Sequence, residues 1–227
     1  GSDVIGEEIN DISDLKPAIA EIVKYVANED KDFTIRIHAG ENDSLRDNVR
    51  KSIMCVKESL QEGQQMPRCR IGHGLYSEDL GSKAGYELME LMAETGIVIE
   101  FQLTSNIRLN NISDLSNHPL KIFLKNGVRC VQGTDGCGFY GSDTIDEQLA
   151  LQNLLGLTEK EFSKMRKTEK EIIEHSEKYF KEKSKKFEKF LNGRNIKEAI
   201  LELEEQNMKE TEGQEELRNS VNLDTEK

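Results

Sequence analysis

The sequence has no apolar run that approaches the length needed to span a bilayer, which argues against a membrane helix. It also has no secretory signal of the charged, apolar and small-residue type. The net charge of −12 argues against a non-specific nucleic-acid or anionic-membrane surface. Its four cysteines include no C-x-x-C pair, so we expect free thiols in a reducing compartment, the cytoplasm.

Apolar residues are scarce as well, at 36% of the chain, whereas charged residues make up 33%. A chain of 227 residues is long enough to bury a sizeable core. This composition nevertheless indicates that part of the length lies outside that core. We therefore expect one domain with an appendage, divided into residues 1–157 and 158–227.

In the first region, short β-rich runs alternate with longer helical patterns. Residues 33–37 alternate apolar and polar side chains as a strand does, and 70–71, 97–101 and 128–131 are further β-rich runs. Apolar residues spaced three and four apart predict helices over 44–61 and 83–95, and Pro119 predicts a helix start for 119–126. This alternation is typical of a parallel α/β sheet.

Polar side chains follow the carboxyl ends of these predicted strands. His38 and Glu41 follow the first run, His73 the second, Thr104-Ser105-Asn106 the third and Asp135 the fourth. A (βα)8 barrel draws its catalytic groups from several strand ends, whereas a doubly wound sheet gathers them at one switch point. We therefore predict TIM-type barrel architecture for this region.

The second region is rich in Glu and Lys, has no strand pattern and is expected to be a charged helical tail. A thin apolar seam is interrupted at Asn192-Gly193, after which a second helix is predicted. We interpret its charges as a solvated helical face in preference to a binding surface.

The polar residues at the strand ends have the chemistry of a metal-assisted hydrolytic site. Imidazole and carboxylate are ligands for zinc, so His38 and Asp135 are candidate ligands. His73 can hold or deprotonate a water, and Glu41 can deliver a proton to the substrate. Each residue alone has a plainer interpretation: a structural histidine, or a helix N-cap for Asp135. The glycines beside His38 and His73, which permit close backbone approach, favour the site.

The chain resembles the adenosine deaminase family of metal-dependent hydrolases over roughly residues 1–165. The matching stretches, in order, are residues 1–8 (GSDVIGEE), 38–41 (HAGE), 70–74 (RIGHG), 104–106 (TSN), 118–120 (HPL), 134–135 (TD) and 156–162 (GLTEKEF).

The resemblance implies hydrolytic deamination of a 6-aminopurine nucleoside or nucleotide with one Zn²⁺ per site. His38 and Asp135 would bind zinc, and Asp135 would also contact the attacking water. His73 would orient and deprotonate that water, while Glu41 would protonate the purine ring nitrogen beside the reacting carbon. Gly6 would donate its backbone N–H to the purine.

Three features depart from the family pattern. The family's His-x-His pair, which supplies two zinc ligands on the first strand, has no counterpart here. Gly136 replaces the usual second aspartate, which predicts a wider substrate pocket, and Gln102-Leu103 replaces the usual Cys-Pro.

The first departure predicts that the chain holds the C-terminal five βα units of the barrel. Two sheet edges would then be left open for a missing N-terminal segment or for self-association. With only His38 and Asp135 as ligands, the chain alone should bind zinc weakly and deaminate poorly.

Two other interpretations stay open. Gly136 is compatible with a metal-dependent amidohydrolase that has a different substrate. The absent His pair is compatible with a non-catalytic module that uses the barrel fragment or the tail for association.

Overall fold

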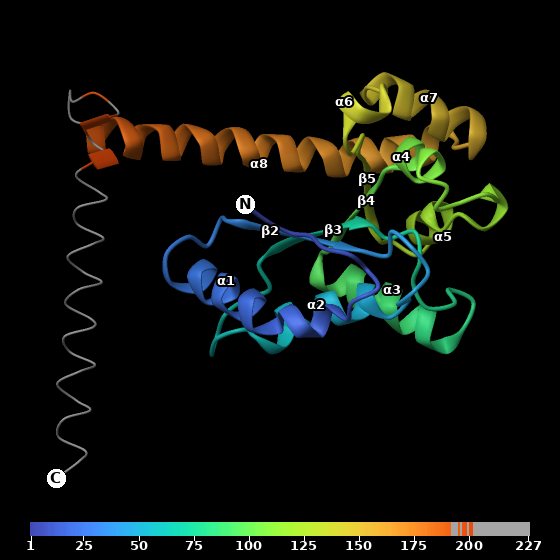
Figure 1. Ribbon diagram of the computed structural model, residues 1–227, viewed down its shortest axis with the longest axis horizontal. Coiled ribbons are helices and arrows are strands. Elements are labelled where there is room, and N and C mark those ends of the chain that lie inside the picture. The colour runs from blue at the N-terminus through green and yellow to red at the C-terminus, as the bar shows by residue number, and fades with distance from the viewer. Residues whose placement is uncertain (192–194, 196, 199, 202–227) are drawn as a thin grey trace, which may run out of the picture. The chain divides into compact units, whose positions relative to one another are not determined.

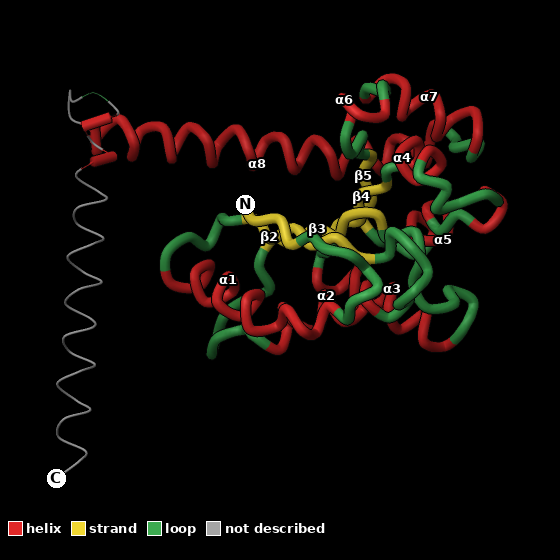
Figure 2. Tube along the Cα trace, viewed as in Figure 1, coloured by secondary structure: helices red, strands yellow, loops and turns green. Residues whose placement is uncertain are grey.

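Five parallel strands form one sheet in the computed structural model, which describes residues 1–191, 195, 197–198 and 200–201. The strands follow chain order across the sheet, and Figure 2 shows them as one continuous layer. They are β1 (Ser2–Val4), β2 (Thr34–Ala39), β3 (Arg68–His73), β4 (Val98–Phe101) and β5 (Arg129–Gln132). The predicted α/β class with five strand–helix units, part of a (βα) barrel, is confirmed.

Helices connect the strands, as parallel pairing requires. Figure 1 shows α1, α2 and α3 on the same face of the sheet. The helices and 3₁₀ segments are η1 (Ile12–Leu15), α1 (Lys16–Asn28), α2 (Asn48–Glu58), α3 (Lys83–Thr95), α4 (Leu103–Arg108), η2 (Leu115–Asn117), α5 (Leu120–Lys125), α6 (Cys137–Tyr140), α7 (Thr144–Leu154) and α8 (Glu159–Leu191).

The core lies between the sheet and these helices. Ile35 and Ile37 on β2 are fully buried, and so are Val49 and Ile53 on the apolar face of α2. Burying side chains of this size stabilises each one by about 1.5–3 kcal/mol relative to exposure. The helical periodicity of 44–61 therefore predicted the face of α2 that packs on the sheet.

The opposite face of the sheet is polar. Arg36 and His38 alternate with the buried isoleucines of β2 and so point away from the core helices. Parallel register places Arg36 between Asp3 on β1 and Arg70 on β3, and it places Gly72 between His38 and Glu100. Side chains from distant parts of the sequence thus share one surface.

The chain divides into two compact units, Gly1–Ile173 and Glu174–Lys227. The first unit includes the start of α8, where Phe162, Met165 and Thr168 are buried. The predicted helical tail is observed as far as Leu191. The predicted break at Asn192-Gly193 and most of the second helix lie outside the described residues. In the part of the chain that the structure describes, no helix has the length and apolar character to cross a bilayer.

Candidate active site

The carboxyl ends of β2 and β3 place two histidines side by side. His38 is the penultimate residue of β2 and His73 is the last residue of β3. Both are buried, and their ring centroids lie 5.3 Å apart. Neighbouring parallel strands end at the same edge of the sheet, so this proximity follows from the strand-end pattern of the sequence.

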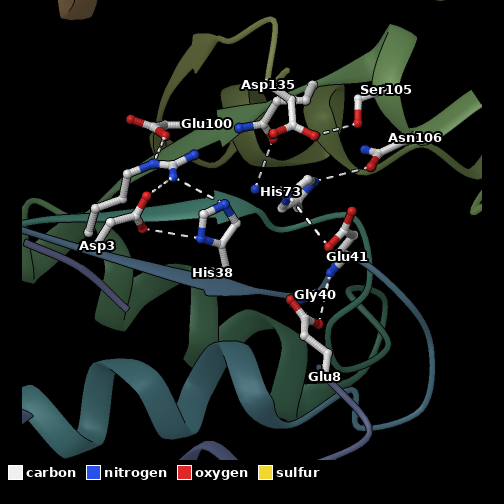
Figure 3. A network of polar contacts seen from close by, with 12 residues as sticks. Asp3, Glu8, His38, Gly40, Glu41, His73, Glu100, Ser105, Asn106 and Asp135 are labelled. Atoms are coloured by element: carbon white, nitrogen blue, oxygen red, sulfur yellow. Dashed lines mark hydrogen bonds and ion pairs between the residues drawn. The ribbon is translucent and has the colours of Figure 1, made fainter. Parts of the chain in front are cut away.

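Glu41, His73 and Asp135 converge beyond these strand ends (Figure 3). One ligand atom of each residue lies within 4.8 Å of the others, and His73 Nε2 is 3.8 Å from Glu41 Oε2. His73 and Asp135 have φ values of 70° and 54°, in the left-handed region that non-glycine residues seldom occupy. Backbone strain of this kind accumulates at functional sites, where the surrounding structure holds it in place.

Two glycines shape the loops that carry these side chains. A Cβ added to Gly40 would lie 2.4 Å from the carbonyl oxygen of Tyr76, and one added to Gly74 would lie 2.6 Å from Ile99 Cγ2. Both glycines also have positive φ. The close backbone approach predicted from the glycines beside His38 and His73 is therefore present.

Residues 102–106 orient His73 and Asp135. Asn106 Oδ1 lies 3.1 Å from His73 Nδ1 and accepts its hydrogen, and Gln102 Oε1 accepts the His73 backbone N–H at 3.0 Å. Ser105 Oγ donates to Asp135 Oδ2 at 2.7 Å. The sequence marked residues 104–106 by their place after a strand, but their positioning roles became visible only in three dimensions.

A buried glutamate on α7 fixes the helix that carries Ser105 and Asn106. Glu147 is fully buried, and its carboxylate accepts the backbone N–H groups of Leu103 and Thr104 at the start of α4. A carboxylate at a helix N-terminus pairs otherwise unsatisfied N–H groups and complements the helix dipole. This six-residue helix is thus held by a side chain more than 40 positions later in the chain.

Glu8 holds the backbone of the loop that carries Glu41. It was not predicted as a site residue. Its Oε2 accepts the backbone N–H groups of Gly40 and Glu41 at 2.7 and 2.9 Å (Figure 3). Burial raises the pKa of Glu8 to about 7, although these two hydrogen bonds act in the opposite direction. The loop that presents Glu41 is therefore anchored by a second, buried carboxyl group.

The surroundings shift the pKa values of His73 and Glu41 in opposite directions. Burial lowers the pKa of His73, which favours the neutral ring. Because Asn106 accepts from Nδ1, the lone pair of that neutral ring is on Nε2, which faces Glu41. Burial and the nearby Asp135 charge raise the pKa of Glu41, which favours its protonated form. The site thus pairs a proton acceptor with a proton donor.

His38 has different partners from the other three predicted residues. Its Nε2 lies 3.1 Å from Nη1 of Arg36, and its Nδ1 lies 3.1 Å from Oδ1 of Asp3. Burial and the Arg36 charge lower the pKa of His38. Arg36 and Asp3 were not predicted, although Arg36 stands two residues before His38, the spacing that places both on one strand face.

The donor atoms fit a divalent metal in part. Glu41, His73 and Asp135 offer imidazole and carboxylate atoms within reach of one ion, which is suitable chemistry for zinc. Of the two predicted ligands, Asp135 belongs to this group, whereas His38 Nε2 faces the Arg36 guanidinium.

Each of the two predicted substrate-binding glycines follows a residue that lines a cavity next to this site, Ile5 before Gly6 and Asp135 before Gly136. Gly6 is exposed in the segment after β1, and a Cβ added there would meet no atom within 4 Å. Gly136 follows Asp135, and a Cβ there would lie 3.2 Å from the Phe139 ring. A cavity of about 600 Å³ is adjacent, and its lining includes Asp3, Ile5, Arg36, His38, Gln102 and Asp135.

Comparison with known proteins decides the family. A sequence model of the adenosine deaminase family matches residues 3–190. The chain belongs to the adenosine deaminase family. Two adenosine deaminases from Escherichia coli, of strains SMS-3-5 and O1:K1, are each 35% identical over 131 residues. In each case the match covers 57% of this chain and 34% of the relative, so the chain spans about a third of these curated relatives.

A solved structure supports the fold of this family member. The adenine deaminase from Arthrobacter aurescens superposes with a TM-score of 0.55 and 17% sequence identity. The superposition covers 73% of this chain and 44% of that protein. The adenosine deaminase family consists of metal-dependent hydrolytic deaminases, and Glu41, His73 and Asp135 form a group in this member that can hold a metal ion.

Proposed function

We propose that this chain supplies the C-terminal part of a zinc-dependent deaminase that hydrolyses a 6-aminopurine nucleoside or nucleotide and releases ammonia. The observation that carries the proposal is the convergence of Glu41, His73 and Asp135 at the strand ends. The opposite pKa shifts of Glu41 and His73 add support, because this reaction needs a proton donor and a proton acceptor together.

In this mechanism His38 and Asp135 would hold the zinc ion, which would lower the pKa of water so that a nucleophile is available near neutral pH. His73 accepts the proton of the attacking water at Nε2, while Asn106 holds the other ring nitrogen in place. Glu41 donates its proton to the purine ring nitrogen next to the carbon under attack. Addition of water at that carbon and departure of ammonia complete the hydrolysis.

The substrate contacts are proposed at the edges of the cavity. The backbone N–H of Gly6 donates to the purine, for which its exposed position leaves room. Gly136 provides no side chain beside Asp135, so the pocket is wider and lacks an acceptor at that point. We therefore expect substrate preference to differ from that of family members with an acidic residue there.

We infer that the 227-residue chain alone is a weak or inactive enzyme that needs the remaining part of the barrel. His38 and Asp135 are too few protein ligands for an ordinary catalytic zinc site. An N-terminal segment would add ligands and cover the open sheet edges. We also propose a cytoplasmic location, which the four unpaired cysteines support, since free thiols persist in reducing compartments.

A complementation assay tests this function. The chain is assayed with adenosine, its 5′-phosphates and other aminopurines, alone and with the N-terminal part of an E. coli relative, with Zn²⁺ present. We expect ammonia release only from the mixture, abolished by Glu41→Gln and retained in Glu62→Gln, a change on an exposed loop. Activity that survives Glu41→Gln would remove Glu41 from the mechanism, and enzyme-like turnover by the chain alone would contradict its proposed dependence on a second segment.

A further inference from the structure

Arg36 places a cation in the interior of the proposed metal site. Its guanidinium is held between two carboxylates: Nη1 lies 2.7 Å from Oδ2 of Asp3, and Nε lies 2.5 Å from Oε2 of Glu100. Its side chain is only 18% exposed. A partly buried guanidinium with two carboxylate partners is held more firmly than an arginine on the surface.

On the neighbouring strand β3, Gly72 leaves space for the Arg36 guanidinium. Gly72 lies next to His38 in the register of β2 and β3. A Cβ added to Gly72 would lie 3.1 Å from Nη2 of Arg36 and 3.2 Å from Cδ2 of His38. The absence of a side chain at residue 72 therefore allows the guanidinium and the imidazole to share one site on the sheet.

The contact between Arg36 and His38 uses the lone pair that a metal would need. A guanidinium has only donors, so at 3.1 Å from Nη1 the Nε2 atom of His38 acts as the acceptor. This leaves the ring proton on Nδ1, which lies at an ion-pair distance of 3.1 Å from Asp3 Oδ1 but forms no hydrogen bond within the described part of the chain. The Nε2 lone pair, which a metal would need, points to Arg36.

We propose that Arg36 controls metal binding at His38: its guanidinium occupies the Nε2 lone pair, and a divalent cation reaches that atom only when Arg36 is displaced. This inference rests on the proposed function, since it concerns the proposed zinc ligand. Metal binding at His38 must break a hydrogen bond and bring a divalent charge next to a partly buried cation.

A charge-balanced double variant provides the test. Arg36→Met with Asp3→Asn removes one cation and one anion together, while Arg70 remains paired with Glu100. Zn²⁺ is titrated into the 227-residue chain, with binding measured by competition with a chelator and the imidazole nitrogens followed by NMR. His38 resonances are assigned with a His38→Gln variant. Asp3→Asn alone and Arg50→Met, at a partly buried pair with Glu78, are the matched controls.

In the wild-type chain and both controls we expect His38 to keep the Nδ1–H tautomer pattern at stoichiometric Zn²⁺. In the double variant we expect His38 Nε2 to shift on metal binding and the affinity for Zn²⁺ to rise at least tenfold. An unchanged affinity in a folded double variant overturns the proposal. So does coordination of wild-type His38 at stoichiometric Zn²⁺, which is measurable whether or not the variant folds.

These outcomes are separable from failure of the proposed deaminase. If wild-type His38 binds Zn²⁺ readily, the role of Arg36 is refuted while the zinc-dependent function stands. If the complemented chain never releases ammonia, the proposed function fails, yet the titration still reports whether Arg36 excludes metal from His38.

Discussion

At the scale of single residues, the position of Glu41 depends on Glu8. Glu8→Ala would leave the backbone N–H groups of Gly40 and Glu41 without their acceptor. An unsatisfied buried polar group costs about 1–3 kcal/mol. We therefore expect a loss of unfolding free energy of that order by urea denaturation, and in the complemented enzyme a fall in kcat that exceeds any change in KM.

The neighbouring variant Glu7→Ala is the control, since Glu7 is exposed. Glu8→Gln retains an acceptor oxygen and should recover most of the lost stability. If Glu8→Ala and Glu7→Ala behaved alike, the anchoring role of Glu8 would be refuted.

Single residues also show how much of the site was predictable. Glu41, His73 and Asp135 were selected by their places after β-rich runs, and the structure brings them together because parallel strands share one carboxyl edge. Asp3 and Arg36 were not selected, since their meeting depends on the register of β1 against β2, which local patterns do not specify. Glu8 was missed for a similar reason: it contacts residues more than 30 positions away.

At the scale of elements, periodicity predicted those segments whose stability comes from an apolar face. The strand pattern of residues 33–37 and the helix pattern of 83–95 were both confirmed as β2 and α3. The helix α4 was not predicted, because six residues are too few for a periodic pattern and its N-terminus is held by Glu147. The helix α1 was also missed, although Ile19, Val23 and Val26 supply helical spacing.

The entry to α5 gives a pH-dependent prediction. His118 lies just before this helix, and its Nδ1 accepts the Leu120 backbone N–H at 3.3 Å. Burial lowers the pKa of His118 to about 4, from an ordinary value of about 6.5. The folded state therefore favours the neutral ring. The contribution of the neutral His118 ring to the unfolding free energy is fully present above pH 6.5. It is lost as the pH falls from 6.5 toward 4.

At about 1.4 kcal/mol per pH unit, the loss of unfolding free energy attributable to His118 approaches 3 kcal/mol. Urea unfolding of the wild type and of His118→Gln between pH 7.5 and 4 measures it. Glutamine keeps an acceptor for the helix N-terminus but does not titrate. The unfolding free energy of the wild type should therefore fall relative to that of His118→Gln as the pH drops across this window. Parallel curves would show that protonation of His118 does not destabilise the fold.

At the scale of the whole molecule, the sheet has two open edges. Among the described strands, β1 pairs with β2 alone and β5 with β4 alone. An edge strand presents unpaired backbone N–H and C=O groups, and such edges promote association between chains. The exposed Ile5 directly follows β1 and adds apolar surface at this edge, since its side chain is 68% exposed.

We therefore expect the isolated chain to self-associate as its concentration rises, measured by sedimentation velocity. Ile5→Lys should weaken association at least tenfold, because a charged side chain beside an edge strand must be desolvated when another chain pairs there. The matched control is Ile145→Lys on α7, where the isoleucine is 67% exposed and lies outside the sheet. Equal effects of the two substitutions would trace association to general apolar exposure, and a monomer at every concentration would show that the edges are protected within the chain.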